Sequence, residues 1–221
     1  MAINDMIQSD YFDKDVDFSA TDFTKTDYQL WVSKHYPKDD EKQGFKAWVG
    51  QLVHKASYDH PEIDVIKEFS FKFIHELEHS IGGSIDRVVR LNNGQWQIED
   101  LKTQGNFPAT KAFKEHPDYW RVQLSVYRYA MMKYYGLDIS NTGIIHQYVM
   151  GHQKNSKLPE YEEYNRLTIE LMSPEETRKF ISDKIAIAYN EIAPMMNCIT
   201  SWQCDYCSYS KACPSSKAKE K

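Results

Sequence analysis

Asp86, Asp100 and Lys102 are the residues whose types and spacing could carry out phosphodiester chemistry. Asp100 and Lys102 lie two positions apart in a segment with strand character, so their side chains share one face, and Glu99 points to the other. A carboxylate and a lysine at this spacing are also common on the solvated face of an ordinary strand, where Asp86 could simply pair with Arg87. The spacing by itself therefore leaves a plain surface role open.

A predicted hairpin brings the two aspartates together. The Asn-Asn-Gly segment at 92–94 has the composition of a three-residue loop whose glycine adopts a left-handed conformation. Leu91 then pairs with Gln95, and counting back along both strands places Asp86 opposite Asp100. Two carboxylates directly opposite each other are unfavourable unless a cation lies between them, so the hairpin predicts a divalent metal site.

The chemistry of such a site would be hydrolysis of a phosphodiester. Magnesium prefers one or two carboxylates together with water and phosphate oxygens, which Asp86 and Asp100 could supply. A metal bound there, Mg²⁺ or Mn²⁺, can activate a water molecule and neutralise charge in the transition state. Lys102 beside it could orient that water or stabilise the developing charge.

Helices and strands that could position these residues follow from the hydrophobic pattern. Apolar residues at helical spacing predict helices at 42–58 and 118–135, and a capping box of Ser173, Pro174 and Glu176 predicts the start of another. The predicted strands cover residues 65–76, 84–91, 96–103, 142–150 and 164–171. This order of elements predicts an α/β fold with a mixed central sheet flanked by helices.

Length and composition limit the class of protein. The 221 residues suit a single domain, with an extension at 1–40, a core at 41–192, a cysteine segment at 193–214 and a disordered tail at 215–221. The net charge of −5 indicates that any contact with nucleic acid is local. The absence of a long apolar run and of a secretory signal predicts a cytoplasmic protein with no membrane partner.

Five short motifs, taken in order, resemble the RecB-type exonuclease branch of the PD-(D/E)XK nucleases, which includes AddAB-type nuclease domains and CRISPR-associated accessory exonucleases. They are GQLVH at 50–54, GSIDR at 83–87, IEDLKT at 98–103, QLSVY at 123–127, and CDYC at 204–207 followed by Cys213 and Pro214. The resemblance implies a restriction-endonuclease-like core and a metal-dependent DNA exonuclease that acts on single-stranded ends. It also implies a place in recombination, repair, phage DNA processing or CRISPR adaptation, with protein partners from those processes. A non-catalytic DNA-binding or assembly subunit with the same fold is the alternative.

The resemblance also implies a role for each matching residue. It makes His54, Asp86 and Asp100 metal ligands, and Asp86, Asp100, Lys102, Gln123 and Tyr127 the catalytic set. Gln123 and Tyr127 are four positions apart on a predicted helix, so they share a face and can reach one site. A histidine beside an apolar helix face is by itself more often a core residue, so the role of His54 depends on the resemblance.

All four cysteines lie near the end of the sequence, at Cys198, Cys204, Cys207 and Cys213. In a reducing compartment such a cluster indicates a metal site before it indicates disulfides. By the resemblance, the last three hold a [4Fe–4S] cluster whose fourth ligand precedes the core in relatives, where this chain has no cysteine. Cys198 or a histidine such as His35 could replace that ligand, and four thiolates could instead bind zinc.

Basic and aromatic residues alternate in and before the predicted helix at 118–135. The basic ones are Lys111, Lys114, Arg121, Arg128 and Lys133, and the aromatic ones are Phe107, Phe113, Tyr119 and Trp120. Such a mixture suits single-stranded nucleic acid, whose phosphates need positive charge and whose bases can stack. Several of these aromatic residues must nevertheless belong to the core.

Overall fold

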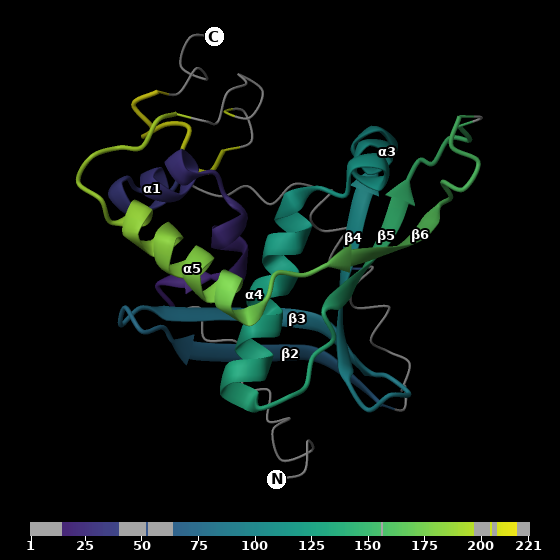
Figure 1. Ribbon diagram of the computed structural model, residues 1–221. Helices are drawn as coiled ribbons and strands as arrows, with labels where there is room; N and C mark the ends of the chain where they lie inside the picture. Colours follow the sequence, from purple (N-terminus) through teal and green to yellow (C-terminus); the bar gives the residue numbers. More distant parts are fainter. Residues whose placement is uncertain are drawn as a thin grey trace.

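The structure, a computed structural model, describes residues 15–39, 52, 64–155, 157–196, 204 and 207–215. Within them a mixed, six-stranded sheet is flanked by helices, as the pattern of the sequence predicts (Figure 1). The elements are β1 (Phe18–Ser19), η2 (Ala20–Thr24), α1 (Asp27–His35), β2 (Val65–Ile74), β3 (Ser80–Arg90), β4 (Trp96–Gly105), α3 (Asn106–Glu115), α4 (Asp118–Tyr135), β5 (Thr142–Met150), β6 (Tyr164–Glu170) and α5 (Pro174–Ala188). Of the helix predicted at 42–58, only Leu52 is described, and it is helical; His54 lies outside the described residues.

The sheet is built around β3 and divides beyond it. β2 runs antiparallel along one edge of β3, while the other edge is shared by β1, which pairs at Ile81 and Gly82, and β4, which pairs at residues 87–90. From Glu99 to Gly105, β4 instead runs parallel to β5, and β6 pairs antiparallel with β5. The sheet therefore forks where β4 leaves β3, and the β2–β3 pair and the β4–β5–β6 group point in different directions (Figure 1).

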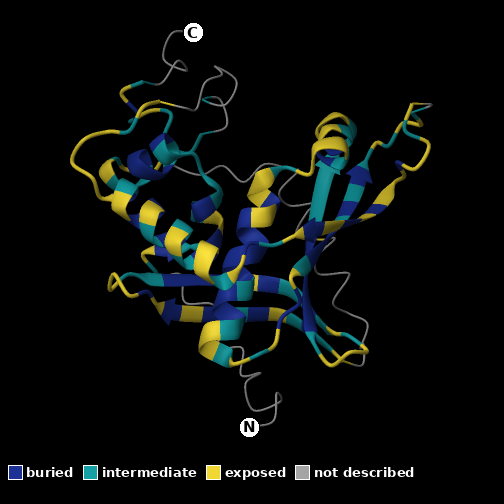
Figure 2. Cartoon of the chain, viewed as in Figure 1, coloured by how far each residue is buried: buried dark blue, intermediate teal, exposed yellow. Residues whose placement is uncertain are grey.

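Helix α4 lies in the core of this arrangement. Every residue from 122 to 127 is buried, because the helix packs on the sheet and is covered by η2 and α5 (Figure 2). A helix buried on all sides must have few charges in its middle, and this one has none between Arg121 and Arg128. Its close approach to β5 requires Gly143, since a Cβ atom there would lie 3.0 Å from Leu124 Cδ1 and 3.2 Å from the Ile98 carbonyl oxygen.

Residues before position 40, which the sequence indicates only as an extension, contribute to the same core. Phe18 is fully buried, and α1 packs against α5. The indole Nε1 of Trp31 donates a hydrogen bond of 2.8 Å to the Asn190 carbonyl oxygen, and Lys184 Nζ lies 2.7 Å from Asp27 Oδ1. The N-terminal segment is thereby attached to the last helix of the fold.

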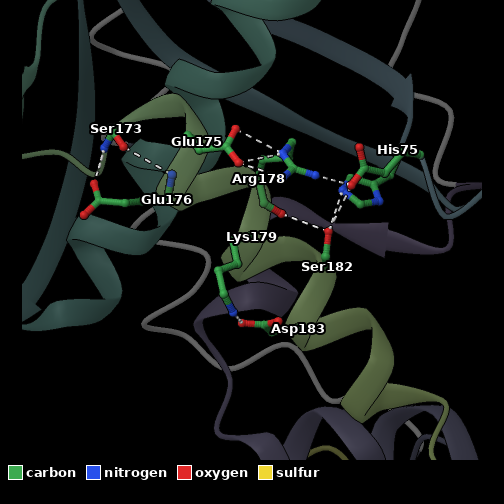
Figure 3. A network of polar contacts seen from close by, with 9 residues as sticks. His75, Ser173, Glu175, Glu176, Arg178, Lys179, Ser182 and Asp183 are labelled. Atoms are coloured by element: carbon green, nitrogen blue, oxygen red, sulfur yellow. Dashed lines mark hydrogen bonds and ion pairs between the residues drawn. The ribbon is translucent and has the colours of Figure 1, made fainter.

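Helix α5 begins at the capping box that the sequence predicts. The Glu176 amide donates to Ser173 Oγ at 3.2 Å, and the Ser173 amide donates to Glu176 Oε2 at 2.7 Å (Figure 3). Further along, Arg178 NH1 lies 2.5 Å from Glu76 Oε1, and Ser182 Oγ is 3.4 Å from His75 Nε2. These contacts attach α5 to the turn between β2 and β3.

Candidate active site

The predicted hairpin loop is confirmed. Leu91 donates its amide to the Gln95 carbonyl oxygen at 2.8 Å, and Gly94 has a left-handed φ of +87°. The register of the strands pairs residue 87 with residue 99, so one step further Asp86 and Asp100 face each other. The two aspartates thus lie side by side at the point where β3 and β4 separate.

Asp86 lies opposite an irregularity in β2, where the pairing with β3 is interrupted. The β2–β3 register passes over the pair of Glu68 with Asp86, and Glu68 has a φ of +48°. Ile85 and Val88, on either side of Asp86 in β3, are fully buried. Asp86 Oδ2 accepts a hydrogen bond of 2.8 Å from the Leu101 amide. Local breaks in strand pairing of this kind are frequent beside active sites, because they re-aim a side chain.

The second part of the site joins β4 to α4. Asp100 is only 2% exposed, and its Oδ2 lies 2.6 Å from Lys102 Nζ. The Gln123 side chain accepts from Lys102 Nζ at 3.1 Å and donates to Asp100 Oδ1 at 3.2 Å. Gln123 also donates to the Tyr127 hydroxyl at 2.7 Å. The structure therefore brings together the five residues of the predicted catalytic set.

The charge of this group suits a cation. Asp86 and Asp100 contribute two carboxylates, and Lys102 supplies one positive charge against them. Carboxylate oxygens are the ligands that Mg²⁺ prefers, and one or two of them suffice when water and phosphate complete the shell. Among the described residues, no group of three or more histidine, cysteine, aspartate or glutamate side chains is placed to hold a metal ion. The donor pair fits a divalent ion that takes its other ligands from elsewhere.

Glu99 anchors the opposite face of β4, as its place in the strand predicts. It is buried, with Oε2 lying 3.0 Å from Arg87 Nε and 2.9 Å from His146 Nε2. Burial raises the pKa of the Glu99 carboxyl, but the hydrogen bonds and charges of His146 and Arg87 outweigh it and hold that pKa below its usual value. The strand that carries Asp100 is therefore held from both faces.

A buried amide beside Lys102 was not predicted. Gln147 on β5 pairs in register with Lys102, is fully buried, and donates to Gln104 Oε1 at 2.9 Å and to the Ala109 carbonyl oxygen of α3 at 3.1 Å. Asn165 on β6 donates to its Oε1 at 3.2 Å. Gln147 thereby connects α3, β4 and β6 at the position on β5 that pairs with Lys102. The available signal was an amide side chain in the middle of a strand.

The described cysteines lie close together near the end of the chain. The Cys207 amide donates to the Cys204 carbonyl oxygen at 3.3 Å, and the Cys213 amide to that of Tyr209 at 2.8 Å. Burial raises the pKa of the Cys207 thiol; a backbone hydrogen bond from Tyr209 opposes this, and the neighbouring Cys213 and Cys204 add to it. Cys198 lies outside the described residues.

Cys213 also shows how this segment meets the rest of the fold. It is buried against Tyr28, Trp31 and Val32 of α1. His35, considered as a fourth ligand, stacks on Trp31 with ring centroids 4.4 Å apart. The cysteine segment therefore packs on the N-terminal helix.

The mixture of basic and aromatic residues predicted to contact DNA divides into two groups. Trp120 is fully buried in the core, and Phe113 packs against Tyr161 with ring centroids 5.3 Å apart. Arg128 NH1 donates to the Met172 carbonyl oxygen at 3.0 Å, so its charge serves the fold. The members that remain exposed are Phe107, Lys111, Lys114, Tyr119, Arg121 and Lys133.

A mixed sheet that forks at two aspartates and a lysine, with a helix behind them, defines the restriction-endonuclease-like class of nuclease folds. The chain belongs to the PD-(D/E)XK nuclease superfamily, whose family model matches residues 20–214. This membership indicates a nuclease that binds DNA, and nucleases of the superfamily generally use divalent metals such as Mg²⁺ or Mn²⁺.

One solved structure with a similar fold is described as "Crystal structure of SSO0001". The similarity has a TM-score of 0.57 at 16% sequence identity and covers 91% of this chain and 88% of the other. No curated protein matches the chain at a significant level. Within the part of the chain that the structure describes, no helix is long and apolar enough to cross a lipid bilayer.

Proposed function

We propose that this protein is a divalent-metal-dependent DNA exonuclease of the RecB-type branch, which hydrolyses phosphodiester bonds at single-stranded ends. The observation that carries the proposal is the contact network of Asp100, Lys102, Gln123 and Tyr127 beside Asp86 at the fork of the sheet. Burying charged groups lowers the stability of a fold, and a catalytic role in a nuclease explains why these are retained.

Asp86 and Asp100 would hold the metal, with His54 as a further ligand by resemblance. When bound, Mg²⁺ or Mn²⁺ supplies a Lewis acid that activates water and offsets charge on the phosphate. The hydrogen bond from the Leu101 amide, 2.8 Å long, holds the Asp86 carboxylate through Oδ2. The Asp100 carboxylate is held through Oδ1 by Gln123 Nε2 and through Oδ2 by Lys102 Nζ.

Lys102 would orient the attacking water or stabilise negative charge as it develops on the phosphate. Its ammonium group needs a defined direction for either role, and Gln123 Oε1, 3.1 Å away, supplies it. Tyr127 in turn accepts from Gln123 at 2.7 Å and fixes the amide. Gln123 and Tyr127 are therefore positioning residues for the lysine and for Asp100.

The test is cleavage of end-labelled single- and double-stranded DNA with Mg²⁺ or Mn²⁺. We expect Asp100→Ala and Lys102→Ala to cleave at least about 100-fold more slowly than the wild type. Lys179 and Asp183 form a matched ion pair of 2.6 Å on the exposed surface of α5, so Lys179→Ala and Asp183→Ala should retain full activity. Equal cleavage by all variants would remove the basis for this active site. DNA binding without cleavage by the wild type would favour the alternative of a non-catalytic assembly subunit.

The exonuclease branch implies work in recombination, repair, phage DNA processing or CRISPR adaptation, and protein partners from those processes. The ordered motifs at 83–87, 98–103 and 123–127 support this part of the proposal. Digestion of a uniquely labelled strand from one end distinguishes exonuclease from internal cleavage. A ladder of internal products from a circular strand would contradict it.

We also propose that Cys198, Cys204, Cys207 and Cys213 bind a structural metal centre, a [4Fe–4S] cluster in preference to zinc. The support is the spacing of Cys204, Cys207 and Cys213, the backbone hydrogen bond from the Cys207 amide to the Cys204 carbonyl oxygen, and the packing of Cys213 on α1. Anaerobic purification followed by visible absorption and metal analysis provides the test. A brown protein that contains iron supports the cluster, and a colourless protein that contains zinc refutes it.

A further inference from the structure

Tyr119, in the first turn of α4, is an exposed aromatic side chain beside Lys102. The residue is 42% exposed. Burial of part of the side chain raises the pKa of its hydroxyl, and a hydrogen bond with the Gln104 side chain and the positive charge of Lys102 oppose that rise. Gln123, one helical turn further along α4, accepts from Lys102 Nζ at 3.1 Å, so Tyr119 lies on the face of α4 that meets the lysine.

The ring is also held in place. Gln104 accepts a hydrogen bond of 2.9 Å from Gln147, which is itself held by Asn165 at 3.2 Å. The ring of Tyr119 packs edge-on against the buried Trp120, with centroids 5.8 Å apart. An aromatic ring fixed in this way loses little side-chain entropy when a ligand stacks on it, which favours binding.

Helix α3 presents a second exposed ring close in sequence to the end of β4. Phe107 is 82% exposed, so its ring is accessible for stacking. Lys111 and Lys114 follow it at spacings of four and three residues, so all three lie along one face of the helix. The Ala109 carbonyl oxygen of the same helix accepts from Gln147, which fixes α3 relative to the lysine of the site.

This stretch also has a different charge from the rest of the chain. Residues 102–121 contain the basic residues Lys102, Lys111, Lys114 and Arg121 and the acidic residues Glu115 and Asp118. The whole chain has a net charge of −5. A local excess of positive charge with exposed aromatic rings matches single-stranded DNA, which offers phosphates and unpaired bases together.

We propose that Tyr119 and Phe107 are specificity residues that stack on unpaired bases beside the cleaved phosphate and so select single strands over duplexes. This inference rests on the proposed nuclease function, whose site supplies the phosphate position. A base within a duplex has both faces stacked on its neighbours and cannot offer one to Tyr119. The wild type therefore binds an unpaired strand more tightly than a blunt duplex of the same sequence.

The experiment measures binding of the full chain to a fluorescent oligothymidylate by anisotropy, in EDTA so that the strand stays intact. Each nucleotide is then replaced in turn by an abasic one. We expect one or two abasic positions to weaken wild-type binding by roughly 5- to 150-fold, the range for loss of one stacked base. Tyr119→Ala should weaken binding of the intact strand to a similar extent. In this variant, an abasic nucleotide at one of the sensitive positions should no longer weaken binding further. Phe107→Ala should do the same at another position.

Matched variants separate stacking from folding. Tyr119→Phe keeps the ring and should bind as the wild type does, while Tyr119→Leu keeps only the bulk and should bind like Tyr119→Ala. Tyr134, on the last turn of α4 and 39% exposed, provides the control Tyr134→Ala, and Met195→Ala provides the control for Phe107. Thermal unfolding of every variant confirms that the folded protein is being compared.

Two results would overturn the proposed stacking by Tyr119 and Phe107 and leave the nuclease proposal intact. One is that Tyr119→Ala and Phe107→Ala bind the strand as tightly as the wild type does. The other is that the wild type binds single strands and blunt duplexes equally. Failure of the nuclease proposal has a different signature. The wild type would then cleave no DNA with Mg²⁺ or Mn²⁺, yet the abasic positions and the Tyr119 variants would still change binding. Retained DNA affinity with lost binding of a protein partner would assign the two rings to a protein interface instead.

Discussion

Replacement of Gln123 by leucine tests the contact network of the candidate site through one buried side chain. Gln123 is 7% exposed, and its amide contacts Lys102 at 3.1 Å, Asp100 at 3.2 Å and Tyr127 at 2.7 Å. Leucine has a similar size and removes all three contacts. Asp100 and Tyr127 are buried and each lose one hydrogen-bond partner, whereas Lys102 is partly exposed, so water can replace the lost amide oxygen while the ion pair with Asp100 remains.

The expected magnitude follows from these contacts. Removal of one partner from a buried polar group costs about 1–3 kcal/mol, and Asp100 keeps its ion pair with Lys102, so we expect Gln123→Leu to lower the free energy of unfolding by about 2–4 kcal/mol. For a chain of this length that corresponds to a fall in Tm of roughly 4–16 °C. Because the lysine loses the contact that directs it, cleavage should slow by about 100-fold.

The measurements are urea and thermal unfolding without metal, and cleavage of end-labelled single-stranded DNA. Gln97 offers the matched control, since it is also 7% exposed but makes longer contacts, 3.3 Å to Thr142 Oγ1 and 3.4 Å to Arg166 NH2. Gln97→Leu should cost no more than about 1 kcal/mol and leave cleavage unchanged. If Gln123→Leu matches Gln97→Leu in both measurements, the reasoning is wrong. If it is destabilised but fully active, Gln123 serves the fold alone.

Three further predictions concern pH and helix capping. The pKa of Glu99 lies below its usual 4.5, so the ionised carboxylate contributes its full stabilisation above pH 4.5 and loses it as the pH falls through the pKa of the folded state. Glu99→Gln should therefore lose less stability in acid than the wild type does. An unchanged dependence of stability on pH would contradict this. Burial lowers the pKa of His75 below 6.5, so in the unfolded chain His75 binds a proton at a higher pH than in the folded protein. The free energy of unfolding is therefore unaffected by His75 above pH 6.5 and falls as the pH drops below it. Asparagine at position 75 can still accept a hydrogen bond from the Leu77 amide but does not titrate, so the urea midpoint of His75→Asn should depend less on pH just below 6.5. An equal pH dependence in the variant and the wild type would argue against this role. Ser173→Ala removes the cap of α5 and should cost about 1 kcal/mol, seen as a fall in Tm of roughly 2–4 °C, whereas an unchanged Tm would show that the cap is dispensable.

The core of the candidate site was predictable because short-range geometry determines it. A three-residue loop ending in Gly94 sets the register of the hairpin, and that register alone places Asp86 opposite Asp100. The four-residue spacing of Gln123 and Tyr127 puts them on one helix face wherever the helix packs. These relations need only neighbouring residues.

Elements that depend on distant partners were not predictable from local pattern. Strand β1 has only two residues, and it exists because it pairs with Ile81 and Gly82 of β3. Helix α3 contains Pro108, a residue that breaks a helix in its interior but is tolerated in the first turn, where no amide donor is required. The polar N-terminal segment becomes structured because Phe18 is buried by residues far along the chain.

The sequence by itself determined the two aspartates, the lysine, the hairpin that pairs them and the helix that carries Gln123, since each follows from spacing along a strand, a turn or a helix. Only the tertiary structure decided that the sheet forks at Asp86, that Gln123 contacts Lys102 and Asp100, and which aromatic residues remain exposed. The physical reason is that burial and polar satisfaction are properties of contacts between distant segments. The local sequence of a stretch such as 107–120 does not distinguish an aromatic ring that faces the core from one that faces a DNA strand.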